Sequence, residues 1–204
     1  MLFDDTYKTI SAPSEGLYKE KGSKFIAYAF PVKSETEIKE HIIRLKKEHH
    51  AARHHCYAYR LLPDKTVFRF NDDGEPSGTA GKPILSQIQS NDLTNILIVV
   101  VRYFGGTLLG VGGLIKAYRT ASIDVINNSK IIIKTVNELY QVSCNYDNQN
   151  DVIKIIKHEN LKVFITISED KPVISFEIRR SKTENVIKFI KLIPNCEIKF
   201  IRNV

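Results

Sequence analysis

The sequence has no tryptophan, a single methionine and only three cysteines in 204 residues. Cys56, Cys144 and Cys196 lie far apart, without a CxxC pair or a zinc-type spacing. Such a sparse, odd set favours reduced thiols and a cytoplasmic protein. The longest apolar run, residues 96–101, is six residues long, whereas a membrane helix needs about 20, so we expect no membrane segment. Residues 1–5 are acidic and lack the apolar stretch of a signal peptide.

Glycine is also scarce, and its distribution divides the chain. Eight of the ten glycines lie between residues 74 and 113, and none follows Gly113. Before this change, hydrophobic periodicity predicts strands at 24–32, 53–62, 66–70 and 96–101 and helices at 34–49, 83–90 and 114–127. Ser34 with Glu37 three residues later is typical of a capping box. The strand at 96–101 is apolar at every position, which predicts burial on both of its faces.

The rest of the chain is predicted to contain four strands and two helices. We expect strands at 134–145, 161–167, 173–179 and 196–202 and helices at 148–158 and 182–192, with a hairpin turn at 169–172. This βαββαβ order is the ferredoxin-like arrangement. The sequence therefore predicts an α+β protein of two domains, residues 1–133 and residues 134–204.

Positive charge exceeds negative charge, with 30 Lys and Arg against 23 Asp and Glu, a net charge of +7. This balance favours anionic partners such as RNA, the ribosome or a nucleotide. The charge is spread along the chain without a run of five like charges, so solvated faces explain much of it.

The glycine-rich segment 105–113 lies between the apolar strand and the helix that follows it. Backbone N–H groups at a helix start can bind an anion, yet neither a Walker A sequence nor a GxGxxG sequence is present. The same glycines also suit tight turns and close packing of the helix on the sheet. Arg102, Lys116 and Arg119 flank the segment and are candidate phosphate ligands, although exposed Lys and Arg are common without such a role.

Two other segments contain chemically versatile side chains. Residues 72–82 (DDGEPSGTAGK) combine carboxylates with hydroxyls, but they do not fit a calcium loop, and Ser77 or Thr79 is an alternative helix N-cap. Residues 49–56 (HHAARHHC) contain His and Cys without a second ligand pair elsewhere. A hydrolase using Ser77 or Cys56 with a histidine is conceivable, whereas a buried cysteine beside half-exposed imidazoles is the plainer interpretation. We predict no metal and no cofactor.

Four segments together resemble the IMPACT family and, within it, the bacterial YigZ-like branch: 21–25 (KGSKF), 54–60 (HHCYAYR), 78–85 (GTAGKPIL) and 99–118 (VVVRYFGGTLLGVGGLIKAY). The resemblance implies a first domain with the βαβ-type fold of a small-subunit ribosomal protein and of domain IV of elongation factor G. It implies a ferredoxin-like second domain similar to domain V of that factor. Eukaryotic members regulate translation through a kinase-activator partner, but they carry a different accessory domain.

We therefore expect a nucleic-acid- or ribosome-binding regulator that acts in translation, and we favour a binding protein over an enzyme. Its alternatives are a protein-interaction regulator that needs no nucleic acid, or a hydrolase built from the acidic and His-rich segments. The oligomeric state is left open. The predicted anion contacts are Arg60, Lys82, Arg102, Lys116 and Arg119, with Gly105, Gly106, Gly110, Gly112 and Gly113 admitting the partner's backbone.

Overall fold

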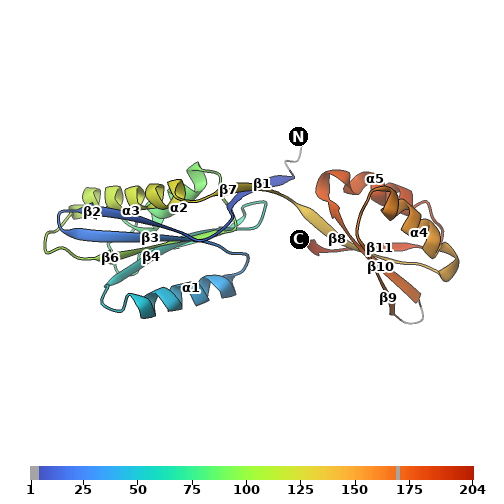
Figure 1. The fold of residues 1–204 in the computed structure, drawn as a ribbon, viewed down its shortest axis with the longest axis horizontal. Helices are drawn as coiled ribbons and strands as arrows, with labels where there is room; N and C mark the ends of the chain where they lie inside the picture. The colour runs from blue at the N-terminus through green and yellow to red at the C-terminus, as the bar shows by residue number, and fades with distance from the viewer. Residues whose placement is uncertain (1–4, 169–170) are drawn as a thin grey trace. The chain divides into compact units, whose positions relative to one another are not determined.

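The computed structural model describes residues 5–168 and 171–204. They form two compact units, one of residues 7–134 and the other of residues 135–204 together with the described residues before Tyr7 (Figure 1). Residues 1–4 and the predicted turn residues Glu169 and Asp170 lie outside the described part. None of the described helices is long and apolar enough to cross a membrane.

The first unit contains a five-stranded sheet and three helices. Its elements are β2 (Ser14–Glu20), β3 (Ser23–Pro31), α1 (Glu35–Glu48), β4 (His54–Leu61), β5 (Val67–Asn71), α2 (Gly81–Ser90), β6 (Ile96–Tyr103) and α3 (Gly110–Asn127). The strand order is β2-β3-β6-β4-β5, and all neighbours are antiparallel. Because β3 and β4 both run antiparallel to β6, they are parallel to each other, and α1 connects them as a split βαβ unit.

The central strand β6 separates two hydrophobic cores. Ile96, Ile98 and Val100 pack with α2 and α3, and Leu97, Val99 and Val101 pack on the opposite face with residues of α1. Figure 1 shows α1 on one side of the sheet and α2 and α3 on the other. This alternation follows from the period of two along a strand, and it confirms that the apolar run is buried on both faces.

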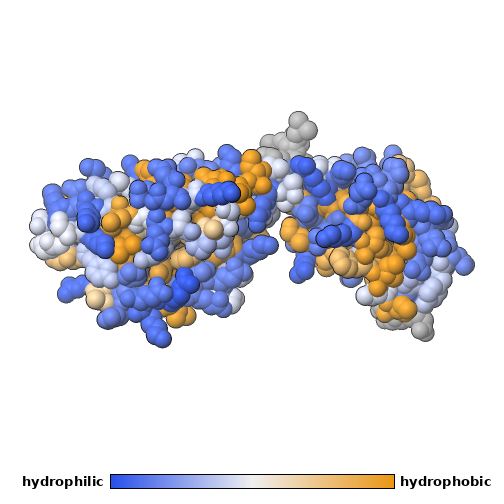
Figure 2. Space-filling view, viewed as in Figure 1, coloured by the Kyte–Doolittle hydropathy of each residue, from blue (hydrophilic) through white to orange (hydrophobic). Residues whose placement is uncertain are grey.

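The second unit is a four-stranded antiparallel sheet with two helices. Its elements are β8 (Asn137–Ser143), α4 (Tyr146–His158), β9 (Val163–Ser168), β10 (Lys171–Arg179), α5 (Arg180–Ile190) and β11 (Glu197–Asn203). The strand order is β11-β8-β10-β9. Val152, Ile156, Val186 and Ile190 of the helices pack on Val142, Ile174, Phe176 and Ile178 of the sheet. This unit also has large apolar side chains at its surface, among them Phe164, Ile167, Phe189 and Leu192, and Figure 2 shows apolar surface on it.

Several boundaries differ from the sequence prediction for identifiable reasons. The helix α3 begins at Gly110 instead of residue 114, because the glycines that indicate a loop also occupy its first turn. The strands β1 (Thr6–Ile10) and β7 (Ile131–Thr135) pair in a small separate sheet that local patterning did not predict. The N-cap at Ser34 is confirmed, with Ser34 Oγ accepting the Glu37 amide at 3.3 Å, while the Glu37 carboxylate accepts the amide of Lys33, one residue before the cap, at 2.9 Å.

Candidate functional site: a pocket at the end of the central strand

A pocket of about 480 Å³ lies in the first unit, where β6 ends and α3 begins. Its lining combines a polar group with an apolar wall; the residues are Arg53, His54, Glu75, Pro76, Arg102, Phe104, Leu108, Leu109, Gly110, Val111 and Leu114. The three segments that sequence analysis considered separately, namely the His-rich, acidic and glycine-rich segments, therefore meet at one place. Tertiary pairing of β4 with β6 brings them together, and no local pattern could have indicated this.

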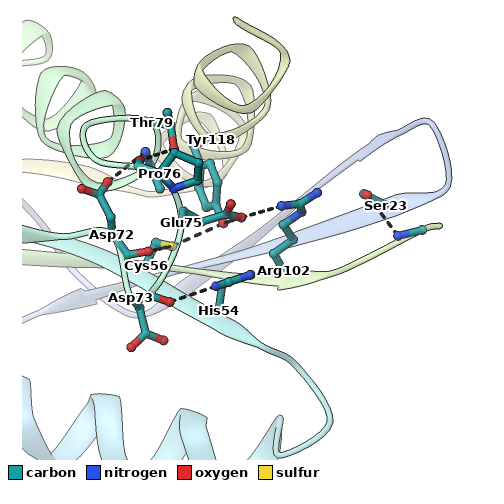
Figure 3. A network of polar contacts seen from close by, with 12 residues as sticks. Ser23, His54, Cys56, Asp72, Asp73, Glu75, Pro76, Thr79, Arg102 and Tyr118 are labelled. Atoms are coloured by element: carbon teal, nitrogen blue, oxygen red, sulfur yellow. Dashed lines mark hydrogen bonds and ion pairs between the residues drawn. The ribbon is translucent and has the colours of Figure 1, made fainter. Parts of the chain in front are cut away.

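An ion pair between Arg102 and Glu75 forms the polar side of the pocket. Arg102 Nη1 donates to Glu75 Oε1 at 2.6 Å, and the Tyr118 hydroxyl donates to the same oxygen at 2.8 Å (Figure 3). The side chains of Arg102 and Glu75 are only 7% and 3% exposed. A buried charge must be compensated, and here each ion compensates the other. Arg102 lies on the α3 face because it continues the row of Ile96, Ile98 and Val100 along β6.

Glu75 does not use all the hydrogen-bonding capacity of Arg102. Arg102 Nε is buried and has no hydrogen-bond partner among the described residues. The guanidinium also lies over the rings of Phe25 and Phe104, at 5.5 Å and 5.6 Å from their centroids. A buried donor without an acceptor costs free energy, so Arg102 keeps an unused donor in a side chain that lines the pocket.

His54 on β4 lies directly beside Arg102 on the neighbouring strand β6, as its partner in the β4–β6 pairing. Its Nδ1 is 2.9 Å from the Asp73 carbonyl oxygen. A carbonyl only accepts, so Nδ1 carries the hydrogen, and in the neutral ring Nε2 is then the acceptor. Figure 3 shows the ring extending away from Asp73. The backbone carbonyl therefore fixes both the tautomer and the orientation of this imidazole.

The carboxylates of the acidic segment are used within the fold. The Asp72 carboxylate accepts hydrogen bonds from the amides of Gly78, Ala80 and Gly81 at 2.8–3.0 Å. It thereby supplies acceptors for the free backbone amides at the start of α2. Neither Ser77 nor Thr79 caps this helix, whose N-cap Ala80 has no side-chain bond.

Asp73 accepts from the His55 amide at 2.7 Å and from Lys46 at 2.9 Å. Burial opposes the ionisation of Asp73, but these bonds hold its pKa below the ordinary value. Among the described residues, no group of three or more His, Cys, Asp or Glu side chains is placed to hold a metal ion.

The conceivable nucleophiles are not activated. Burial raises the pKa of the Cys56 thiol far above its usual range, and this thiol donates to the Asp72 carbonyl at 2.9 Å. Burial also lowers the pKa of His55. Between the described residues Ser77 and either His54 or His55 there is no hydrogen bond, so the structure does not bring together the hydrolase set that the sequence left open.

The five glycines of segment 105–113 have different structural reasons. A Cβ at Gly105 would stand 1.9 Å from the Gly22 backbone, so only glycine fits there. Gly106 and Gly110 have positive φ, and Gly113 is close to Leu109. Gly112 is exposed, helical and faces open space, with no atom within 4 Å of a built Cβ. The fold therefore explains every glycine of this segment except Gly112.

The predicted cationic residues separate into two groups. Arg102 is paired with Glu75, and Arg60 lies at the other end of β4, opposite Ile96, with Asp92 and the Leu93 carbonyl as partners. Six strand residues, or about 20 Å, separate this end from His54. Lys82, Lys116 and Arg119 are exposed and form no ion pair with a described residue. Arg53, which sequence analysis did not single out, is exposed and lines the pocket.

Residues 21–126, about half of the chain, match the family described as the Impact N-terminal domain. The chain belongs to the Impact family. It is 41% identical over 128 residues to an IMPACT family member of Haemophilus influenzae, covering 62% of each protein. It is 38% identical over 138 residues to the IMPACT family member YigZ of Escherichia coli, covering 67% of this chain and 68% of that one. This Impact-family chain also resembles a crystal structure titled as that of an hypothetical protein, with a TM-score of 0.75, 28% identity and coverage of 97% and 98%.

Proposed function

We propose that this Impact-family protein is a nucleic-acid- or ribosome-binding regulator that acts in translation, and that it contacts the phosphate backbone through the start of α3. The observation that carries the proposal is the uncapped N-terminus of this helix. It has no side-chain cap and no acidic residue in its first turn, so its backbone amides and its dipole favour an anion.

Two cations without an ion-pair partner among the described residues extend the same surface. Lys116 and Arg119 are exposed and stand about one turn apart on α3, roughly 9 Å and 14 Å along the axis from Gly110. A polyanion lying along this helix therefore contacts the helix start and both side chains. Gly112 fits the same interpretation, because a residue without a side chain lets a partner's backbone approach the helix closely.

The strand order of the second unit also supports the proposal. Relabelled in chain order from one to four, its strands stand in the order four-one-three-two, and we propose that it is a ferredoxin-like domain. With the first unit as a split βαβ domain, the combination agrees with the resemblance to domains IV and V of elongation factor G. The net charge of +7 is in keeping with a phosphate-rich partner.

Co-sedimentation with ribosomal subunits and with bulk RNA, over a range of salt concentrations, tests the proposal. In Lys116→Gln/Arg119→Gln we expect weaker binding and a logarithmic salt slope smaller by about 0.7–0.9 per lost phosphate contact. The matched control is Lys188→Gln/Lys191→Gln, because Lys188 and Lys191 have the same spacing and are exposed at α5. Binding that is absent at low salt, insensitive to salt, or equal in both double variants contradicts the proposal.

Gly112 separates a functional role from a structural one. Gly112→Leu replaces a helical glycine that faces open space, so it should stabilise the first unit by up to about 1 kcal/mol. If the partner's backbone lies against Gly112, the same variant should bind less well. Unchanged binding in a stabilised Gly112→Leu protein would remove Gly112 from the contact surface.

A protein partner is the second candidate, and one observation favours it. Phe104, Leu108 and Val111 are 50%, 83% and 60% exposed beside the basic surface, and clustered exposed apolar side chains mark interaction sites. Treatment of the sedimented complex with nuclease distinguishes the two candidates. A complex that survives nuclease favours a protein partner, and one that dissociates favours nucleic acid.

A further inference from the structure

We propose that the pocket at the end of β6 binds a small organic acid, a carboxylate attached to an apolar aromatic or aliphatic body. The site lies beside the surface proposed above for nucleic acid, but it has a different ligand and a different chemical basis.

The first argument is the unused hydrogen-bonding capacity of Arg102. The Arg102 side chain lines the pocket and is only 7% exposed. Its Nε–H has no hydrogen-bond partner among the described residues. Since Nη1 already donates to Glu75, Nε and Nη2 remain as an adjacent pair of donors. Two parallel N–H groups of a guanidinium match the two oxygens of a carboxylate.

The second argument is the charge balance of the lining. Glu75 contributes one negative charge, whereas Arg102 and Arg53 contribute two positive charges, and the Nδ1–H of His54 is committed to the Asp73 carbonyl. The pocket therefore has an uncompensated positive charge. An anionic group lowers the electrostatic energy there, and a cation does not.

The third argument concerns the rest of the ligand. Six of the lining side chains are apolar, namely Pro76, Phe104, Leu108, Leu109, Val111 and Leu114. All of them except Pro76 come from the loop after β6 and the first turns of α3. A volume of about 480 Å³ falls within the range of small-molecule sites, roughly 300–1,000 Å³. Burial of apolar ligand surface against this wall supplies affinity, while the guanidinium selects the acid.

The test compares acids with their neutral amides by NMR titration of the full-length protein. The probes are 1-naphthylacetate with 1-naphthylacetamide, and octanoate with octanamide. The reporters are the backbone amides of Gly110, Val111 and Leu114 at the pocket. We expect saturable shifts of these amides with at least one acid, and binding of the matching amide that is weaker by about tenfold or more. Which pair responds distinguishes an aromatic from an aliphatic body.

Three variants keep the test decisive. Arg102→Lys retains the positive charge but lacks the adjacent pair of N–H donors, so the preference for acid over amide should become several-fold smaller. Val111→Asp places a carboxylate at the pocket in the first turn of α3, where an acid suits the helix dipole, and it should weaken acid binding. The control Ile43→Asp makes the same change at a 68% exposed position of α1, on the other face of the sheet, and should bind like the unmodified protein.

Equal binding of acid and amide, an undiminished preference in Arg102→Lys, or shifts that never saturate at the three reporters would overturn the proposal. None of these outcomes bears on ribosome or RNA binding, which is measured separately by its salt dependence.

Discussion

Glu75→Gln should destabilise the first unit strongly, although the substitution changes hardly any volume. Glu75 is 3% exposed and its Oε1 accepts from both Arg102 and Tyr118. The glutamine keeps an acceptor but leaves the Arg102 charge buried without a counter-ion. Breaking a buried ion pair in this way costs about 3–5 kcal/mol. With a urea m-value of about 1–3 kcal/mol/M, the unfolding midpoint should fall by roughly 1 M or more.

Tyrosine fluorescence during urea unfolding is a suitable assay, because the chain has no tryptophan and seven of its nine tyrosines lie in residues 7–134. The matched control is Glu48→Gln, which removes the exposed pair with Arg44 on α1 and should cost no more than about 0.5 kcal/mol. Glu75→Gln/Arg102→Met should recover much of the lost stability, since a neutral pair has no uncompensated charge. Coincident midpoints for Glu75→Gln and Glu48→Gln would refute the reasoning.

Three further predictions concern single side chains. Asp72→Ala should cost about 1–2 kcal/mol, as loss of a helix cap does, and should speed amide exchange at the start of α2; unchanged exchange would contradict the cap. The pKa of Asp5 lies below its ordinary 3.8 because Arg179 donates to it, so its stabilisation is present above about pH 3.8 and is lost as the pH falls further. The melting-temperature advantage over Asp5→Asn should therefore shrink below about pH 4, and a constant advantage would argue against this role. Iodoacetamide near neutral pH should alkylate Cys56 only after unfolding, because its thiol is buried and its pKa is raised; rapid labelling of native Cys56, detected by mass spectrometry, would be inconsistent with this burial.

The sequence predicts most elements of the fold because their signals are local. The signal of Ser34 and Glu37 lies within four residues, and the apolar run of β6 is contiguous in the sequence. The start of α3 is predicted four residues late, since Gly110, Gly112 and Gly113 are poor helix formers. The pair of β1 with β7 joins segments more than 120 residues apart, and a local window contains no information on such a contact.

The candidate site is harder to predict than the fold, for the same reason. The place of Arg102 beside the glycine segment predicts a functional role, but its partner Glu75 is 27 residues away in a segment that suggests a loop. His54 becomes part of the site only through the pairing of β4 with β6. A cation that follows an apolar strand can point outward or into the core, and only the position of an acidic partner decides between these alternatives.

The alternation along β6 has a consequence for how the sheet assembles. A slip of one residue along this strand would turn the row that ends in Arg102 toward α1 and away from Glu75. The slipped sheet would still bury apolar side chains on both faces, because β6 is apolar on both. It would, however, bury a guanidinium without a counter-ion, at a cost of several kcal/mol. The ion pair thus discriminates between two arrangements that hydrophobic burial alone would leave almost equal in energy.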